Sequence, residues 1–403
     1  MRLVRLLLIA GMILAGVGLS TERDAARAAQ EAAASAAAGL GAAAPDWCVA
    51  FATAEHAPHM PTLLAALSAA TGTPYVVGCS AAGVIAGAAE VEDGPAVGVL
   101  AVSSDKVRGT PFLFHDDGDQ GLTAGIRIGQ RLLGSRGTGD LVLVWPDPFH
   151  VSAERLLHGL DAALSGVPVA GGAASSRGGE ETTIQFCGEE SASAAVSGVR
   201  LGGAFRHQIA ITHGCRPLSE PLLVTRSHEN LILEVEGEPA LEALRRRAPV
   251  AMSDDPIRVL GNLFVGILSD TEEMPLRTDD YLIRSIIAAD PDTGVLAIAD
   301  TVEEGQRILF AIREPRTARH DLARTIERLR STRGDVEYRF GLYFNCLARG
   351  RSLYGQGGVD AAALSAAFPG VPFLGFFSNA EIAPRRGANQ VFTYTGVLVL
   401  VGE

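Results

Sequence analysis

The chain has 403 residues, of which 47% are hydrophobic, so it is long enough for two or three domains and too apolar to be disordered. Its formal net charge is -12, and its acidic and basic residues are mixed along the chain. An acidic balance without a basic stripe argues against nucleic acid as a partner.

The N-terminal segment has two interpretations. Residues 6–20 are uncharged and follow a basic start, as in a signal peptide, although the stretch is too short for a membrane span of about 20 apolar residues. Alternatively, residues 13–19 form a first core strand, and Ser20 or Thr21 caps an alanine-rich helix over residues 22–38. We favour the strand because the helix follows without a cleavage spacer, and we expect no membrane association.

One unit recurs three times along the chain. Each copy has an apolar strand, a helix ending in Ala-Leu-Ser, a second strand after a proline, a small-residue loop and an apolar strand with Gly-Val. The first strands cover 46–51, 140–145 and 340–344, the helices end at Ser68, Ser165 and Ser365, the prolines are Pro74, Pro168 and Pro372, and the last strands contain Gly98, Gly198 and Gly396. These patterns predict an α/β fold of strand-helix-strand-loop-strand units with helices packed on the sheets, and equivalent positions for the three prolines.

The region from Arg206 to Arg330 is expected to be built differently. Its patterns predict strands at 231–235, 262–267, 294–298 and 307–311 and helices at 238–247 and 318–330. We therefore expect two fused domains, covering residues 12–218 and 219–403.

Several motifs resemble the FIST family, a name that abbreviates F-box and intracellular signal transduction. The run Gly78-Cys79-Ser80-Ala81-Ala82-Gly83 is similar to a loop of the FIST N domain, and residues 280–294 resemble the opening of the FIST C domain. The runs 345–350 (Asn-Cys-Leu-Ala-Arg-Gly) and 375–382 (Gly-Phe-Phe-Ser-Asn-Ala-Glu-Ile) resemble the C-terminal signature. The resemblance covers nearly the whole chain and implies a sensory protein that binds a small ligand such as an amino acid, with a downstream signalling partner that the sequence does not name.

The third copy of the unit carries the main candidate site. Asn345, Cys346 and Arg349 follow its first strand, and parallel strand ends that face a crevice are the usual place for ligand groups in α/β proteins. A ligand carboxylate can pair with the guanidinium of Arg349 in two hydrogen bonds. The alternative is structural: Arg349 bonds to Glu381 and ties two loops together.

Three polar residues follow the second strand of the same copy. Ser378, Asn379 and Glu381 leave the apolar strand together, and Glu381 is a candidate partner for a ligand amino group. A salt bridge from Glu381 to Arg349 or Arg385 is the structural alternative. A helix between the two strands makes them parallel, so we expect Arg349, Ser378, Asn379 and Glu381 to converge, with Cys346 beside them.

Cys79 and Ser80 lie in the corresponding loop of the first copy and complete the candidate ligand-binding set. A rival interpretation makes Cys346 or Cys79 the nucleophile of a hydrolase, which requires a nearby base to form the thiolate. The histidines are scattered and form no familiar pattern with either cysteine, so we assign no catalytic residue. A second rival is a scaffold that binds only proteins.

The cysteines indicate the compartment. The chain has five cysteines and no C-x-x-C pair, so neither a disulfide framework nor a structural zinc site is predicted, and free thiols suit the cytoplasm. Export through the signal-like segment is the alternative. Under the cytoplasmic interpretation, an early start-codon assignment accounts for residues 1–11.

Two further patterns are weak, and no cofactor or metal is predicted. His56 and His59 lack a third metal ligand nearby, and the glycine-rich run 171–179 lacks the Lys-Ser/Thr ending of a P-loop. Asp147, with His150, is interpreted as a surface group. The leading hypothesis is therefore a cytoplasmic small-ligand sensor.

Overall fold

The computed structural model describes residues 11–134, 139–177, 181–248, 260–268 and 281–403. Contacts divide the chain into two compact units. The large unit comprises Met1–Ile211, Thr325–Val391 and Thr395–Glu403, and the small unit comprises Thr212–Arg324 and Phe392–Tyr394. The predicted α/β class is confirmed, with helices packed on several sheets.

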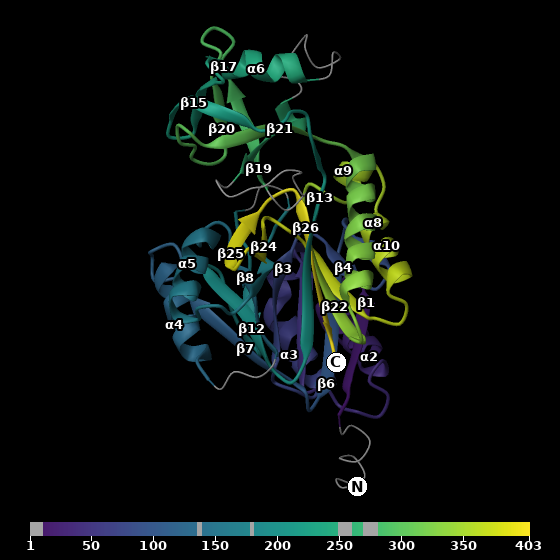
Figure 1. The fold of residues 1–403 in the computed structure, drawn as a ribbon. Coiled ribbons are helices and arrows are strands. Elements are labelled where there is room, and N and C mark those ends of the chain that lie inside the picture. The colour runs from purple at the N-terminus through teal and green to yellow at the C-terminus, as the bar shows by residue number, and fades with distance from the viewer. Residues whose placement is uncertain (1–10, 135–138, 178–180, 249–259, 269–280) are drawn as a thin grey trace. The chain divides into compact units, whose positions relative to one another are not determined.

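The large unit consists of three repeats, each longer than the sequence pattern indicated (Figure 1). Repeat 1 runs β1 (Ile13–Ser20), α2 (Ala25–Ala38), β2 (Trp47–Thr53), η1 (Ala54–His59), α3 (Met60–Thr71), β3 (Val76–Ala81), β4 (Val84–Ala86), β5 (Ala89–Val91) and β6 (Val97–Ser104). Repeat 2 runs β7 (Val107–His115), α4 (Leu122–Leu132), β8 (Gly139–Pro146), α5 (Ala153–Ala163), β9 (Val169–Gly172), β10 (Gln185–Cys187), β11 (Glu190–Ala192) and β12 (Ala195–Gly203).

Repeat 3 has the same elements but is split in the sequence. It runs β13 (Arg206–His213), α8 (Pro315–Thr332), β22 (Tyr338–Cys346), α9 (Arg351–Tyr354), α10 (Val359–Ala367), β23 (Phe373–Ser378), β24 (Glu381–Arg385), β25 (Ala388–Phe392) and β26 (Thr395–Gly402). The elements of the small unit are inserted between β13 and α8. The expectation that residues 206–330 lack the repeat is therefore wrong at both ends, where β13 and α8 belong to repeat 3.

The three sheets of the large unit share one plan and exchange hairpins in a cycle. Their orders are β1-β6-β2-β3-β10-β11, β7-β12-β8-β9-β24-β25 and β13-β26-β22-β23-β4-β5. Hairpin β4–β5 of repeat 1 extends the sheet of repeat 3, β10–β11 of repeat 2 extends that of repeat 1, and β24–β25 of repeat 3 extends that of repeat 2. The loops expected from sequence thus interlock the repeats.

Three glycines fix the equivalent positions of the repeats. A Cβ at Gly78, Gly171 or Gly375 would overlap the carbonyl oxygen of the paired residue on the first strand, and those residues are Ala50, Val144 and Tyr343. The carbonyls of Pro168 and Pro372 accept hydrogen bonds from amides of β8 and β22, respectively. In repeat 1 the carbonyl of Tyr75, and not that of Pro74, accepts the corresponding bond from β2. The expected equivalence of Pro74 is therefore wrong by one residue.

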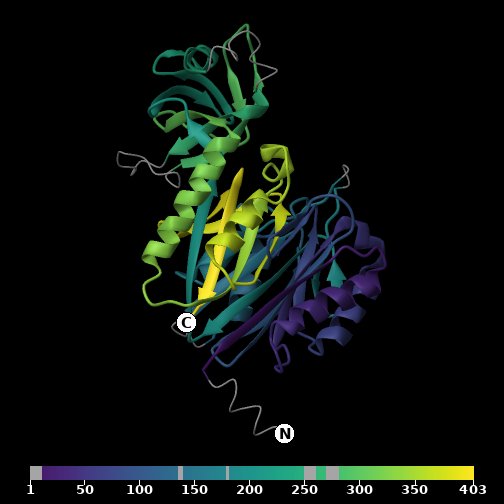
Figure 2. The same cartoon turned by 90° about the vertical axis from the view of Figure 1, so that its right-hand side faces the viewer.

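The Ala-rich helix α2 packs closely on its sheet, which Figure 2 shows in purple. Its buried residues are alanines spaced three or four positions apart, and a Cβ at Gly16 or Gly18 of β1 would overlap carbonyls of this helix. The strand interpretation of residues 13–19 is confirmed, but the cap is Asp24, which accepts a bond from Arg27 N at 2.9 Å. The expected caps Ser20 and Thr21 are wrong. Residues 1–10 lie outside the described residues.

Aromatic rings from all three repeats meet in the interior of the large unit. The ring of Phe51 lies 5.3 Å from that of Trp145 and 4.5 Å from that of Phe376, which also packs on Phe344. These residues come from β2, β8, β23 and β22, so the inner faces of the three sheets share one core. The parallel strand ends of each repeat are held in place by this core.

The small unit is built around a closed sheet. It contains β14 (Cys215–Pro217), β15 (Leu222–His228), β16 (Leu231–Val235), β17 (Glu238–Pro239), α6 (Ala240–Arg247), η3 (Leu260–Asn262), β18 (Leu263–Leu268), β19 (Tyr281–Ala289), β20 (Leu296–Ile298) and β21 (Arg307–Arg313). β18 pairs with both β19 and β21, so the path β21-β15-β16-β20-β19-β18 closes on itself. The predicted strands at 231–235, 262–267, 294–298 and 307–311 are confirmed, each shifted by a few residues at most.

The expected boundary near residue 218 divides the sequence into an N-terminal and a C-terminal domain. The two compact units are instead each made of separate sequence segments, so this boundary stays a prediction. Among the residues with described positions, no helix is long and apolar enough to cross a membrane.

Candidate functional site

The candidate site lies at the carboxyl ends of β22 and β23. The two strands are parallel and adjacent, with Cys346 paired in register to Ser378. The sequence argument for parallel strands is therefore confirmed, and the loops that follow them leave the same edge of the sheet. Ser378 Oγ lies 3.2 Å from the carbonyl oxygen of Asn345, which joins the two strand ends directly.

Arg349 is fully buried and paired with Asp360 at the start of α10. Its Nε donates to Asp360 Oδ2 at 3.0 Å, and its Nη2 lies 2.9 Å from the same carboxylate and donates to Tyr354 OH at 2.9 Å. Tyr354 and Tyr343 each donate a hydroxyl hydrogen bond to Asp360, at 2.8 and 3.0 Å. The direct partner of Arg349 is therefore Asp360, which the sequence argument missed, and not Glu381.

Burial keeps both tyrosines of this network protonated. It raises the pKa of Tyr343 and of Tyr354 well above that of an exposed tyrosine, so both phenols remain donors to Asp360. Burial works against the charge of Arg349, but Asp360 outweighs it and holds the pKa of the guanidinium above its usual value. The network is an ion pair with no net charge.

Glu381 forms a second buried cluster with Ser378 and Thr395. Glu381 Oε1 lies 2.8 Å from Ser378 Oγ, and Oε2 accepts bonds from the amide and the hydroxyl of Thr395 at 3.2 and 2.9 Å. Burial raises the pKa of Glu381 to about 8, while these hydrogen bonds and the charge of Arg349 act in the opposite direction. Ser378 Oγ donates to Glu381 Oε1 and also lies within hydrogen-bond distance of Asn345 O.

Three buried polar atoms of the site have no hydrogen-bond partner among the described residues. They are Oδ1 and Nδ2 of Asn345 and Nη1 of Arg349, and both side chains are 0% exposed. Side chains alternate along a strand, so Asn345 is on the same face of β22 as Tyr343, which bonds to Asp360. An unpaired buried donor or acceptor costs about 1–3 kcal/mol. The site therefore carries polar groups that the fold leaves unused.

Three of the other predicted site residues do not join this cluster. Asn379 is exposed, whereas Cys346 is buried at the end of β22, where it pairs with Ser378. Cys79 and Ser80 lie in β3 of repeat 1 and hold hairpin β10–β11: Cys79 pairs with Gln185, and Ser80 Oγ accepts from Ile184 N at 2.9 Å. Burial raises the pKa of the Cys79 thiol well above its usual value, the opposite of what a nucleophile requires.

The polar set of the site occurs in one repeat. Strand register and pairing place the following residues at equivalent positions of repeats 1, 2 and 3: Ala52, Pro146 and Asn345; Ala81, Ala174 and Ser378; Val84, Gln185 and Glu381. Counting four residues beyond Ala52, Pro146 and Asn345 gives His56, His150 and Arg349. Repeat 1 is therefore apolar at the three paired positions where repeat 3 has an amide, a hydroxyl and a carboxyl group.

The weaker candidates have structural surroundings. His56 is buried and His59 exposed, and no group of three His, Cys, Asp or Glu side chains in the described ranges is arranged for a metal ion. Asp147 is fully buried and accepts bonds from Phe149 N and Ala194 N at 2.9 and 2.8 Å, so its interpretation as a surface group is wrong. Its carboxylate joins the loop after β8 to the residue before β12, and His150 contacts it at 3.0 Å.

In the glycine-rich run 171–179, Ser175 bonds to Phe377 O and Ala82 N, so this hydroxyl joins the three repeats; residues 178–180 lie outside the description.

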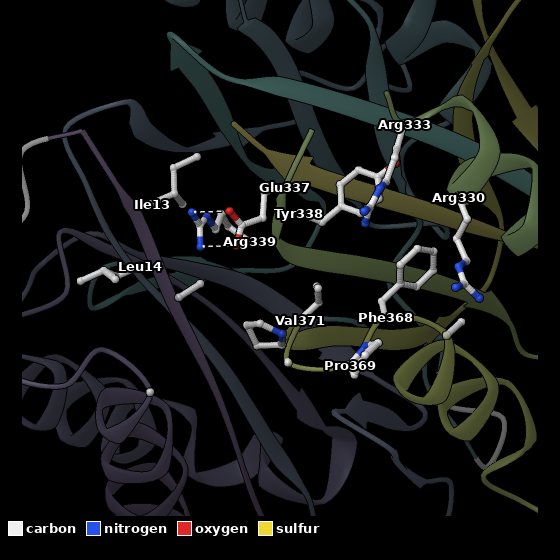
Figure 3. Close-up of a pocket in the computed structure, with 15 residues that line it drawn as sticks. Ile13, Leu14, Arg330, Arg333, Glu337, Tyr338, Arg339, Phe368, Pro369 and Val371 are labelled. Carbon is white, nitrogen blue, oxygen red and sulfur yellow. Dashed lines mark hydrogen bonds and ion pairs between the residues drawn. The ribbon is translucent and has the colours of Figure 1, made fainter. Parts of the chain in front are cut away.

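Two open pockets of the large unit lie at the amino ends of parallel strands, whereas the candidate site lies at the carboxyl ends. One, of about 510 Å³, is lined by residues at the start of β22 and just before β23, including Tyr338 and Pro372 (Figure 3). The other, of about 900 Å³, is lined by residues at the start of β2 and just before β3, including Trp47 and Tyr75. Neither lining includes the residues of the candidate site, which is closed in this structure.

Comparison with known proteins places the chain in a family. A model of the FIST N domain matches residues 46–238, and a model of the FIST C domain matches residues 240–384. The chain is 33% identical to the uncharacterized protein Rv0628c of Mycobacterium tuberculosis over 96% of this chain and 98% of that protein. It is 32% identical to the uncharacterized protein Mb0898c of Mycobacterium bovis over 96% and 98%.

A crystal structure of a cyanuric acid hydrolase from A. caulinodans aligns with 48% of this chain and 71% of that one, at 10% identity and a TM-score of 0.28, too low to support an argument. The family models, by contrast, cover nearly the whole chain in the order that the sequence motifs indicated. The chain belongs to the FIST family, whose N and C domains are sensory domains of signal transduction.

Proposed function

We propose that the protein is a cytoplasmic sensor that binds a free amino acid at the carboxyl ends of β22 and β23, between Asn345 and Arg349. The observation that carries this proposal is the set of buried polar atoms without partners at Asn345 and Arg349. Such groups destabilise a fold that gains nothing from them, and strained or unsatisfied positions concentrate at functional sites. In repeats 1 and 2 the position equivalent to Asn345 is occupied by Ala52 and Pro146, which supports a function specific to repeat 3.

The charges of the site favour a zwitterion over a simple anion. Asp360 already neutralises Arg349, and burial raises the pKa of Glu381 to about 8, which favours its neutral form. A ligand with no net charge therefore avoids placing an unpaired charge in a buried site. The carboxylate of an amino acid would accept from Arg349 Nη1 and Asn345 Nδ2, and its ammonium group would donate to Asn345 Oδ1.

Entry of the ligand requires movement of the segment that contains α9, because the site is buried. Three glycines with positive φ flank this short helix: Gly350 (φ 61°), Gly355 (φ 73°) and Gly358 (φ 80°). Glycine adopts such angles without strain and gives a backbone more freedom than other residues do. Glu92 of repeat 1 holds the segment through the amide of Arg351, at 2.9 and 3.0 Å. Glu90 holds the other end of the segment through the amide of Gly358 at 2.7 Å, so movement of the segment would break both contacts.

None of the five cysteines, all of which lie in the described ranges, forms a disulfide, which suits the reducing cytoplasm of the proposal. The hydrolase alternative draws no support from Cys79, whose thiol is buried and has a raised pKa.

The test is a thermal-shift screen of the twenty protein amino acids, with the variant Asn345→Leu as the critical comparison. We expect at least one amino acid to stabilise the wild type, by about 2.7 kcal/mol at a concentration one hundred times its Kd, and its deaminated carboxylic acid to do so far less. Asn345→Leu removes two unpaired polar atoms at similar volume, so it should raise the melting temperature of the free protein by several degrees and abolish the ligand shift.

Ala52→Leu in repeat 1 is the matched control, because Ala52 stands at the equivalent strand position. It should leave the ligand shift of the surviving folded protein unchanged. A lower melting temperature for free Asn345→Leu, or an unchanged ligand shift in it, would refute the proposed site.

A further inference from the structure

The 510 Å³ pocket at the amino ends of β22 and β23, here called the basic pocket, combines an apolar floor with arginines. Its floor includes the rings of Phe368 and Tyr338, which pack edge to face with centroids 5.7 Å apart. Val371 and Leu14 extend the apolar lining (Figure 3). Both rings are mostly buried, at 4% and 6% exposed, so the floor is fixed by packing and does not depend on a ligand.

The lining of the basic pocket carries three arginines and one glutamate. Arg339 is neutralised, because its Nε donates to Glu403 Oε1 at 2.8 Å and its Nη1 lies 2.9 Å from Glu337 Oε1. Arg330 and Arg333 are exposed, and the described residues offer them no ion-pair partner. Figure 3 shows them beside Phe368 and Tyr338, away from the Arg339–Glu337 pair. Two cations thus remain available above the aromatic floor.

The second pocket of the large unit has the same place in its repeat but a different charge. Its lining contains two arginines, Arg108 and Arg131, and two aspartates, Asp46 and Asp105, so its charged side chains balance. The basic pocket lies at the start of β22 and just before β23, and the second pocket lies at the corresponding place, at the start of β2 and just before β3. The repeat therefore builds the hollow, and the end of α8, with Arg330 in its last turn, gives the basic pocket its charge.

We propose that the basic pocket is a second ligand site that binds a small organic anion with a ring-sized apolar body, whose carboxylate or phosphate head group pairs with Arg330 and Arg333. Guanidinium groups pair with either head group through two parallel hydrogen bonds, and the aromatic floor takes the body. Part of the charge of Arg330 interacts with the carboxyl end of α8, whereas Arg333 lies beyond the helix end.

This site is separate from the one proposed for the amino acid. Tyr338 begins β22 and Cys346 ends it, so the two sites lie at opposite ends of a nine-residue strand, about 25 Å apart at a rise near 3.3 Å per residue. Binding at one site can therefore be measured without occupying the other.

The test titrates the full-length protein with 3-phenylpropionate, phenyl phosphate, the neutral 3-phenylpropionamide and inorganic phosphate, by calorimetry. We expect saturable binding of at least one aromatic anion, at least tenfold tighter than the amide and inorganic phosphate, and weaker at high salt. Whichever aromatic anion binds more tightly identifies the head group. The double variant Arg330→Glu/Arg333→Glu should lose at least tenfold in affinity for it.

Arg108→Glu/Arg131→Glu is the matched control, because these exposed arginines line the balanced pocket. It should bind the aromatic anion as the wild type does. The proposal is overturned if no aromatic anion binds saturably, if the amide or inorganic phosphate binds as well as the anions, or if Arg330→Glu/Arg333→Glu, folded by its melting curve, keeps wild-type affinity.

Discussion

Repeats 1 and 3 of the large unit share a backbone but differ in the polar side chains at their strand ends. Both place a glycine against a carbonyl of the first strand, at Gly78 and Gly375. Only repeat 3 follows this with a polar set, since Asn345 and Glu381 stand where repeat 1 has Ala52 and Val84. The comparison separates residues that build the repeat, which recur, from residues that serve a function, which do not.

The same comparison explains why burial alone does not define the site. In repeat 1, Thr53 Oγ1 at the end of β2 accepts from Ala96 N at 2.9 Å, but neither ring nitrogen of the buried His56 has a partner among the described residues. In repeat 3, the side chain of Asn345 has neither its donor nor its acceptor paired among those residues, and Arg349 Nη1 is unpaired as well. Repeat 3 is therefore distinguished by an unpaired amide and an unpaired guanidinium nitrogen together, where repeat 1 has Ala52 and His56.

The largest effect is expected at the recurring glycines. Gly375→Ala would drive a Cβ into the carbonyl of Tyr343, a backbone atom that cannot move without separating β22 from β23, so we expect no soluble folded protein. Gly202→Ala in β12 meets nothing within 4 Å and should keep a wild-type melting temperature. Folded Gly375→Ala with wild-type circular dichroism would break the assignment of equivalent positions.

The next effect concerns the buried ion pair. Arg349→Met leaves Asp360 charged and unpaired, and Asp360→Leu does the same to Arg349, so each should lower the free energy of unfolding by about 3–5 kcal/mol. The double variant removes both charges and should be more stable than either single variant, as measured by urea unfolding. Additive losses would mean that the two side chains do not act as a pair. This replaces the expectation that Arg349 is tied to Glu381.

A smaller, pH-dependent effect is expected at Glu381. Its pKa is about 8 in the folded protein against 4.5 ordinarily, so the folded state binds the extra proton between these values. The contribution of Glu381 to the free energy of unfolding should therefore be fully present below pH 4.5 and be lost as pH rises to about 8, by on the order of a few kcal/mol. Glu381→Gln keeps a neutral donor and should lack this loss. Parallel pH profiles for the two proteins would contradict the raised pKa.

The sequence predicted the repeat well where the pattern was local. Strand-helix-strand order, parallel β22 and β23, and the convergence of Ser378 with Glu381 all follow from short spacings and chain direction. The hairpin exchange did not follow, because β4 and β10 pair with strands of other repeats and nothing in their own sequences names the partner. The split of repeat 3 was hidden by the inserted small unit.

Asp360 shows the same limit at the level of a single residue. It lies on α10, which follows β22 and precedes β23 in the sequence, in a short alanine-rich stretch whose pattern does not single out this residue. A buried arginine requires a partner, and that rule alone could have prompted a search for one. Choosing Asp360 over Glu381 required the three-dimensional position of the helix.

Hydrogen exchange with and without an amino acid that stabilises the wild type tests the central claim most directly. We expect slower exchange on binding in peptides that cover residues 345–358 and 378–384 of repeat 3, and unchanged exchange in residues 53–60 of repeat 1. Protection confined to the basic pocket, equal protection in both repeats, or no stabilising amino acid at all would contradict an amino-acid site at the ends of β22 and β23.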